Sequence, residues 1–495
     1  MSGNNVKYNN IIYVFMPFRF DDIEDVFNNA KERCSDVEDP IWKNGANDIK
    51  SYFFKFLTDK IKEPRGDNPD RRCCIHLAVK EKITDKNKFM LADDWEDTLE
   101  KQSEILGLSM SDKFRLNLNR TSSLKVLYPN KDIDLLFHFD SFRLSIFKTG
   151  IGIVSLGLVF DSNDPEDWAL AENLLKNAYN LHFYKDGTTN YNYMQFITFA
   201  NTLVNSAKVS SKNDLKFRFF SPHPRANLLS LFIVENAELP DIEKTHYYLG
   251  NGYNKGFMYP GAGKTGGCQF FGDPNLRWGV SNEIVSCLVQ PNLHPDARDY
   301  IYNDFYFKFR HGYLFMYVWL LHQKYALYSF LTDISVKNLA SADPDNSEEL
   351  KNYKQRFAEF EANYDFARIA EVPQYQIPYD TVSRQFALKT MYEDVKEPLK
   401  ALENLVREEE EHIKEKEQKA ATRIATALSF FAILSVFSAY IDSYEFVGKF
   451  FGGDGPILGK TIWAIRIILF GVITVGWFCI IHNIYVHKDS KKQGE

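Results

Sequence analysis

The sequence lacks an excess of basic residues, and that absence excludes one broad class of partner. Its 59 Lys and Arg residues are outnumbered by 66 Asp and Glu residues, so the formal net charge is −7. Proteins that bind nucleic acids through the phosphate backbone normally carry clustered positive charge. We therefore expect no nucleic-acid partner.

Cysteine is also scarce, with six residues in a chain of 495. They include no CxxC pair and have no histidine at zinc-finger spacing, so the sequence predicts no zinc site. We interpret all of them as reduced thiols. The first residues, MSGNNVKYNN, lack the basic region and the apolar run of a secretory signal, which places the start of the chain in the cytosol.

Signs of catalysis are missing as well. The sequence shows no convincing nucleophile with its base, carboxylate pair or metal cluster. The stretch YPGAGKTGG, residues 259–267, is similar to a phosphate-binding loop, but Met258 stands where the first glycine of that motif belongs. Neither an apolar strand nor a helix is expected beside it. We therefore predict that the protein is not an enzyme and has no resident metal or cofactor.

Aromatic residues, in contrast, are abundant, with 41 Phe and 27 Tyr. Apolar runs between turn signals predict an α/β cytosolic domain over residues 1–340, which we interpret as ligand-sensing. Asp164 and Pro165 have the residue types that begin a helix. The predicted strands are 11–18, 74–83, 135–147, 153–160 and 228–236, and the predicted helices are 165–181 and 312–334.

Four basic residues in this domain are candidate ligand-binding residues. Lys264 and Arg277 lie in a glycine-rich stretch, 250–279, whose backbone N–H groups could hold an anion. If residues 305–310 form a strand, Lys308 and Arg310 point to one face and can pair with phosphate. We expect a small nucleotide or another anion here. The alternatives are a flexible surface insertion and an aromatic core with solvated basic edges.

The C-terminal region, residues 424–495, predicts a two-helix transmembrane hairpin. Residues 424–441 and 467–486 are long runs without Asp, Glu, Lys or Arg, and the first is about 27 Å long as a helix, close to the apolar thickness of a bilayer. Lys and Arg residues flank the hairpin, which predicts a protein of the cell membrane with both termini in the cytosol. The alternative is a pair of buried core helices.

Residues 341–423 predict a helical segment and a long stalk helix that starts at Pro398 and leads into the first span. The stalk is strongly polar, and such a helix is stable when several copies surround a hydrated axis. We therefore expect a homo-oligomer in the lipid bilayer. A solvated linker helix is the alternative.

One face of the first span has the pattern of a pore lining. Hydroxyl side chains are followed by bulky apolar ones at steps of three and four, which suits a pore with a hydrophobic gate at Ile433 and Val436. Asp442 follows at the outer end. The predicted pore-lining residues are Thr422, Thr426, Ser429, Ile433, Val436, Tyr440 and Asp442.

The arrangement resembles the CorA family of divalent-cation channels. Residues 360–402 are similar in spacing to the segment that leads into the CorA stalk, and residues 135–160 resemble the family's cytosolic strand pair. The resemblance implies a funnel-shaped homopentamer whose first spans line an axial pore. The family's Gly-Met-Asn is absent, because FSAYIDSY, residues 437–444, stands in its place, so selection of hydrated magnesium is not implied.

The long region before the spans resembles the CorA-like membrane effectors encoded beside type III CRISPR systems. That resemblance implies a pore opened by a nucleotide second messenger in antiviral defence, for which a conjugate of AMP with S-adenosylmethionine is one candidate. The alternative function is a divalent-cation (Mg²⁺) transporter with altered selectivity. A third possibility is a membrane-tethered binding protein that conducts nothing.

Overall fold

The computed structural model describes most of the chain between Asn10 and Phe450. It divides into two units, Met1–Val406 and Arg407–Glu495, each considered by itself. The described residues are 10–20, 22–36, 42–49, 53–64, 70–79, 81–84, 88–91, 114–117, 134–176, 182–185, 189–192, 220, 225–234, 238–290, 295–336, 344–450, 468 and 471.

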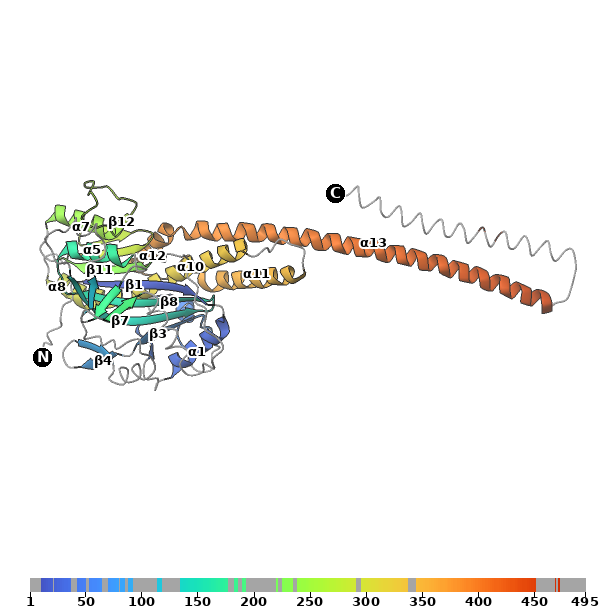
Figure 1. Ribbon diagram of the computed structural model, residues 1–495, viewed down its shortest axis with the longest axis horizontal. Helices are drawn as coiled ribbons and strands as arrows, with labels where there is room; N and C mark the ends of the chain where they lie inside the picture. The colour runs from blue at the N-terminus through green and yellow to red at the C-terminus, as the bar shows by residue number, and fades with distance from the viewer. Residues whose placement is uncertain are drawn as a thin grey trace. The chain divides into compact units, whose positions relative to one another are not determined.

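Within the described part of the first unit, twelve strands form one mixed sheet (Figure 1). Its main order is β10-β9-β6-β7-β8-β1-β11-β14-β13-β12, and β3 joins β7 and β2 beside this path. β11 and β14 pair in parallel, whereas β1 is antiparallel to both of its neighbours. The strands are β1 Asn10–Arg19, β2 Trp42–Asn44, β3 Cys74–Val79, β6 Phe114–Asn117, β7 Asp134–Phe147, β8 Ile151–Phe160, β9 His182–Lys185, β10 Thr189–Asn192, β11 Asn227–Ile233, β12 Gln269–Asp273, β13 Leu276–Val280 and β14 Ile284–Val289; β4 Glu81–Thr84 and β5 Lys88–Leu91 pair separately.

Helices cover both faces of this sheet. Three of them, α1, α5 and α7, contribute to a hydrophobic core on one face, and α10, α11 and α12 contribute to a core on the other. The segments η3 and η4 are π-helical and lead into α10. The helices are α1 Ile23–Ser35, η1 Gly45–Asp48, α2 Lys55–Thr58, α5 Pro165–Leu175, α7 Leu239–Asn251, α8 Pro295–Asp299, η3 Tyr300–Phe305, α9 Tyr306–Lys308, η4 Phe309–Tyr313, α10 Leu314–Val336, α11 Pro344–Tyr364, α12 Pro373–Gln385 and α13 Leu388–Phe450.

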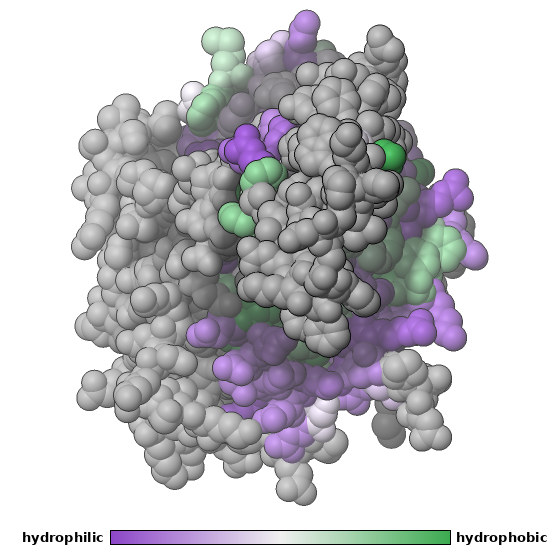
Figure 2. All heavy atoms as spheres, turned by 90° about the vertical axis from the view of Figure 1, so that its right-hand side faces the viewer, coloured by the Kyte–Doolittle hydropathy of each residue, from purple (hydrophilic) through white to green (hydrophobic). Residues whose placement is uncertain are grey.

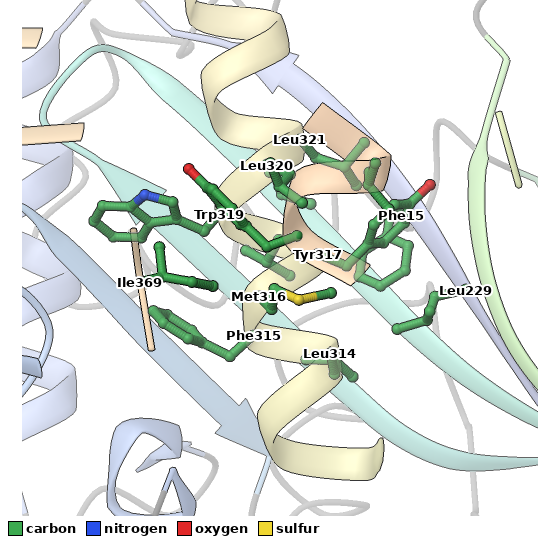
Figure 3. Close-up of a cluster of buried hydrophobic side chains, with 14 of the residues drawn as sticks. Phe15, Leu229, Leu314, Phe315, Met316, Tyr317, Trp319, Leu320, Leu321 and Ile369 are labelled. Carbon is green, nitrogen blue, oxygen red and sulfur yellow. The ribbon is translucent and has the colours of Figure 1, made fainter. Parts of the chain in front are cut away.

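The first part of α10 is apolar and buried on all sides. Its residues from Leu314 to Leu321 are each 0% exposed, and they pack in one core with β1, β8, α11 and α12. Figure 3 shows Phe15 of β1 and Leu229 of β11 beside the consecutive side chains of this helix. A helix without a polar face is stable only inside a layered structure of this kind.

Four of the five strands predicted in the first unit are confirmed with small shifts at their ends, whereas the predicted strand 74–83 is divided into β3 and β4, which belong to separate sheets. Residues 11–18 correspond to β1 and residues 135–147 to β7, for example. The Asp164 side chain accepts a hydrogen bond of 2.9 Å from the Glu166 N–H, so it caps α5 as expected. That helix ends at Leu175, earlier than predicted.

The predicted transmembrane hairpin is wrong. Among the helices formed by the described residues, none is long and apolar enough to cross a membrane, so the predicted place in the cell membrane is wrong too. Residues 424–441 do not end in a turn at Asp442, because no glycine pair or proline follows them until Gly452, and α13 continues to Phe450. The second predicted span, 467–486, lies outside the described residues except for Ile468 and Gly471.

The stalk prediction also needs a correction at its start. The helix α13 begins at Leu388, so Pro398 lies inside it and not in its first turn. The residues between them include Met391 and Val395, which are buried in the core of the first unit and hold this part of the helix there. Packing of these apolar residues outweighs the hydrogen bond that proline removes.

The predicted pore-lining residues lie along α13. The hydroxyls of Thr422, Thr426 and Ser429 are exposed and donate to carbonyl oxygens one turn earlier in the same helix. Val436 is exposed and Ile433 is partly exposed. Tyr440 and Asp442 belong to the helix, but their side chains lie outside the described ones.

The surface of the molecule is mainly polar where the described residues are visible. Figure 2 shows hydrophilic side chains over most of the described surface on that side, with smaller hydrophobic patches between them.

One close contact in the sheet leads to a stability prediction. Gly152 of β8 lies opposite Phe18 of β1, and a Cβ atom added to Gly152 would lie 2.1 Å from the Phe18 ring. We expect Gly152→Ala to lower the free energy of unfolding by about 1–3 kcal/mol, because the buried ring has to move. Urea unfolding measures this change. The loss should be smaller in a Phe18→Leu background, and an equal loss in both backgrounds would contradict the explanation.

Candidate anion-binding site

A β-bulge in β7 is the first element of the candidate site. One edge of β7 pairs with β6 up to Phe137 and with β3 from Arg143 onward, and its register with β8 shifts between Phe139 and Ser141. The extra residue at this shift is Asp140. A bulge re-aims side chains at the point where regular pairing stops, and here it places the Asp140 carboxylate beside the Ser141 hydroxyl, both close to Gly157.

Cross-strand pairing brings further polar side chains to the same face. Ser155 of β8 lies directly opposite Arg143, and His76 of β3 lies directly opposite Ser145. Tyr13 of β1 and Ser141 both lie opposite Gly157. Residues that face each other across strands share one side of the sheet. This is the side covered by α10, so these polar groups are enclosed between the sheet and the helical layer.

The π-helical segment η4 adds a charged group from the helical layer. Arg310 is buried, and its Nη2 atom lies 2.8 Å from Asp140 Oδ1. The Tyr13 hydroxyl lies near both of these charges; burial raises its pKa, the Asp140 charge raises it further, and Arg310 and Arg143 lower it. Short π-helical stretches often occur at functional sites, and this one directs an arginine side chain against the bulge.

Two histidines in the cluster are neutral. Burial, together with the nearby Arg143 charge, lowers the pKa of His76 to about 3. The pKa of His311 is lowered to about 2 by burial and then by Arg143 and Arg310. His76 Nδ1 lies 2.7 Å from the Ser145 hydroxyl oxygen. Both imidazoles are therefore hydrogen-bonding groups at neutral pH and add no charge.

The charged groups described in the cluster include two buried arginines and one buried carboxylate. Among the described residues whose charges act on its titratable groups, Lys43, Arg143 and Arg310 are cations and Asp140 is the carboxylate. Arg143 is 3% exposed, and its Nε and Nη1 atoms have no hydrogen-bond partner among the described residues. The hydroxyls of Ser141 and Ser155 are buried without a partner there as well. The arrangement thus offers several donors to a group that accepts hydrogen bonds.

A buried carboxyl group on the opposite face of the sheet avoids the cost of an unpaired buried charge in a different way. Glu172 of α5 is 0% exposed and accepts a hydrogen bond from the Ser230 hydroxyl. Burial raises its pKa well above the usual range, which favours the protonated, uncharged form. An arginine cannot lose its charge in this way. Arg143 therefore needs a counter-charge, whereas the uncharged form of Glu172 does not.

Of the four predicted ligand-binding residues, Arg310 belongs to this cluster. Lys264 is exposed in the glycine-rich stretch, and Arg277 is partly exposed on β13, where its Nε donates to the Pro274 carbonyl. Lys308 lies in α9 over the Tyr300 ring, at 5.0 Å. Residues 305–310 are helical, so the predicted strand is wrong and Lys308 does not share a face with Arg310.

The sequence analysis missed the residues of β7 and their neighbours. The signal was present, because DSFRLS, residues 140–145, has polar residues at alternate positions of a strand that is otherwise apolar. Such alternation is normally a solvated face. The π-helical segment and the covering helix α10 turn this face into an interior one. In the described residues no group of three or more His, Cys, Asp or Glu side chains could hold a metal ion.

The depressed histidine pKa values predict acid sensitivity. Between pH 6.5 and about 3 the unfolded chain binds a proton at His76 and the folded chain does not, so stability falls as the pH falls through this range. Each such histidine contributes a slope of up to about 1.4 kcal/mol per pH unit. We expect His76→Gln to reduce the slope of unfolding free energy against pH by up to this amount. Denaturant unfolding at pH 4–7 measures it, and an unchanged slope would contradict the prediction.

Comparisons with protein-family models, with curated proteins and with solved structures find no match for this chain. The resemblance to the CorA family therefore stays a prediction, and so do the homo-oligomer and the channel or transport activity that it implies.

Proposed function

We propose that the unit Met1–Val406 is a binding domain for a small phosphate-bearing ligand. The ligand's oxyanion would bind between β7, β8 and η4, at the cluster around Arg143. The observation that carries this proposal is the buried Arg143 guanidinium, whose Nε and Nη1 atoms have no acceptor among the described residues.

The energetics of burial support an anionic partner. A buried charge without a counter-charge costs several kcal/mol, even after the protein relaxes around it. Asp140 is already paired with Arg310 at 2.8 Å, and Arg143 forms no ion pair with another described residue. An oxyanion beside Arg143 would neutralise this charge and accept hydrogen bonds from the nearby Ser141 and Ser155 hydroxyls.

The chemistry of the donors favours phosphate among anions. A guanidinium offers parallel N–H groups that match two oxygens of a phosphate. Hydroxyls and neutral imidazoles add donors from other directions, which suits a tetrahedral group better than a planar carboxylate. A nucleotide, the ligand class expected from the sequence, carries such a group. We therefore retain a nucleotide as the leading candidate and leave membrane conduction out of the proposal.

The burial of the cluster supports a binding event that is coupled to a conformational change. Arg310 and Phe309 of η4 are buried against the sheet, and a ligand reaches Arg143 only if this cover moves. A ligand that binds the opened or re-closed arrangement more tightly shifts the population toward it. The association rate constant should then be below roughly 10⁵–10⁷ M⁻¹s⁻¹, the range that is typical of binding without rearrangement.

The test compares the wild type with Arg143→Met in phosphate-free buffer and in added inorganic phosphate. Phosphate at about 100 times its Kd should raise the wild-type unfolding free energy by about 2.7 kcal/mol. The variant should gain nothing from phosphate. Without phosphate it should be as stable as the wild type or more stable, because an apolar side chain replaces an uncompensated buried charge. Thermal and denaturant unfolding measure both effects.

Arg19→Met is the matched control. Arg19 is also largely buried, but it forms a two-pronged ion pair with Asp333, at 2.8 and 3.0 Å. Its loss should destabilise the protein and leave the gain from phosphate unchanged. Equal phosphate stabilisation of the wild type and Arg143→Met would refute the proposed site, and the absence of any phosphate effect on the wild type would refute phosphate binding.

A further inference from the structure

The two carboxylate oxygens of Asp140 have different surroundings. Its Oδ1 atom accepts from Arg310 Nη2 at 2.8 Å, whereas its Oδ2 atom is buried without a hydrogen-bond partner among the described residues. The side chain is 3% exposed. A Cβ atom added to Gly157 would lie 3.1 Å from Asp140 Oδ2 and 2.6 Å from the Ser141 hydroxyl oxygen. Both of these oxygens therefore pack closely against the bare backbone of Gly157, on the face of the sheet that carries Arg143.

A carboxylate oxygen in this position restricts which anions can bind beside it. Ionised Asp is an acceptor only, so it can meet an oxyanion favourably only through a proton that the oxyanion carries. An oxygen without a proton would face Oδ2 as a like charge in a setting that screens charge poorly. The same site therefore attracts anions through Arg143 and discriminates among them through Asp140.

We infer that the site selects tetrahedral oxyanions that present an O–H group to Asp140, namely inorganic phosphate and phosphate monoesters, and rejects sulfate and phosphate diesters. This inference rests on the proposed function and specifies its ligand class. Hydrogen phosphate and the singly protonated monoester have one hydroxyl to donate. Sulfate has none near neutral pH, and a diester has lost both protons to its esters. Ligands with a terminal phosphate fit this rule, and internally linked ones do not.

The expected discrimination is large because a buried polar group would otherwise be left unpaired. Sites built around one hydrogen bond to a ligand hydroxyl reject analogues without it by roughly 10⁴-fold or more. The Arg310 pair holds the Asp140 carboxylate in place, so it cannot turn away to avoid a proton-free anion. We expect sulfate to bind at least about 100-fold more weakly than phosphate, which is a smaller preference than the one such sites reach.

The experiment is titration calorimetry on the full chain at pH 7 with inorganic phosphate and with sulfate. The wild type should bind phosphate and show at least the stated preference over sulfate. In Asp140→Asn the amide can donate a hydrogen bond to a proton-free oxygen, so sulfate should bind more tightly and the preference should fall at least tenfold, by about the measure of one hydrogen bond. Asp333→Asn is the control, because it also alters a carboxylate paired with a largely buried arginine, Arg19, and should leave the preference unchanged.

A second titration uses the wild type alone, so it tests the inference even if Asp140→Asn fails to fold. Methyl phosphate should bind, and dimethyl phosphate should not. Equal binding of phosphate and sulfate, or of the monoester and the diester, would overturn the inference and leave the proposed phosphate-binding function standing. If none of these anions binds the wild type, the proposed function itself fails.

Discussion

Burial of the sheet on both faces is the constraint on which the rest of the structure depends. A sheet covered on one side can turn its polar residues to water, whereas this one has a core on either side, built by α1, α5 and α7 and by α10, α11 and α12. Every polar side chain on a central strand must then find a partner inside the protein. The apolar helix α10 follows from this arrangement, and so does the enclosure of the polar face of β7.

The two faces of the sheet meet this requirement in opposite ways. Burial raises the pKa of Glu172 and favours its uncharged form, since a carboxyl can take a proton when it is buried. Arg143 has no such option, and the surrounding histidines are held neutral by burial and by its own field. The Asp140 carboxylate is shared with Arg310. What distinguishes this face is therefore the buried Arg143 guanidinium, whose Nε and Nη1 atoms have no hydrogen-bond partner among the described residues.

Local patterns predicted the parts of the fold that local forces decide. Strand β1 and the Asp164 cap of α5 follow from an apolar run and from a capping residue, so the sequence was sufficient for them. The helical state of residues 305–310 could not be predicted in this way, because aromatic residues favour strands and only packing around α10 decides otherwise. The residues of β7 were missed for the same reason, since DSFRLS lies in the interior only because η4 and α10 cover it. Arg310 was predicted as a ligand-binding residue, but from a strand that does not form.

The position of β1 has a consequence for the newly made chain. This strand of residues 10–19 leaves the ribosome before its partners in the sheet, β8 and β11, whose residues begin at 151 and 227. At a synthesis rate of about 5–20 residues per second, the first partner follows many seconds later. During that interval a nearly continuous apolar segment has no native neighbour to pair with, and such segments are sites of misassembly. Production of the chain should therefore depend on chaperones that hold its first residues until the middle of the sequence is complete.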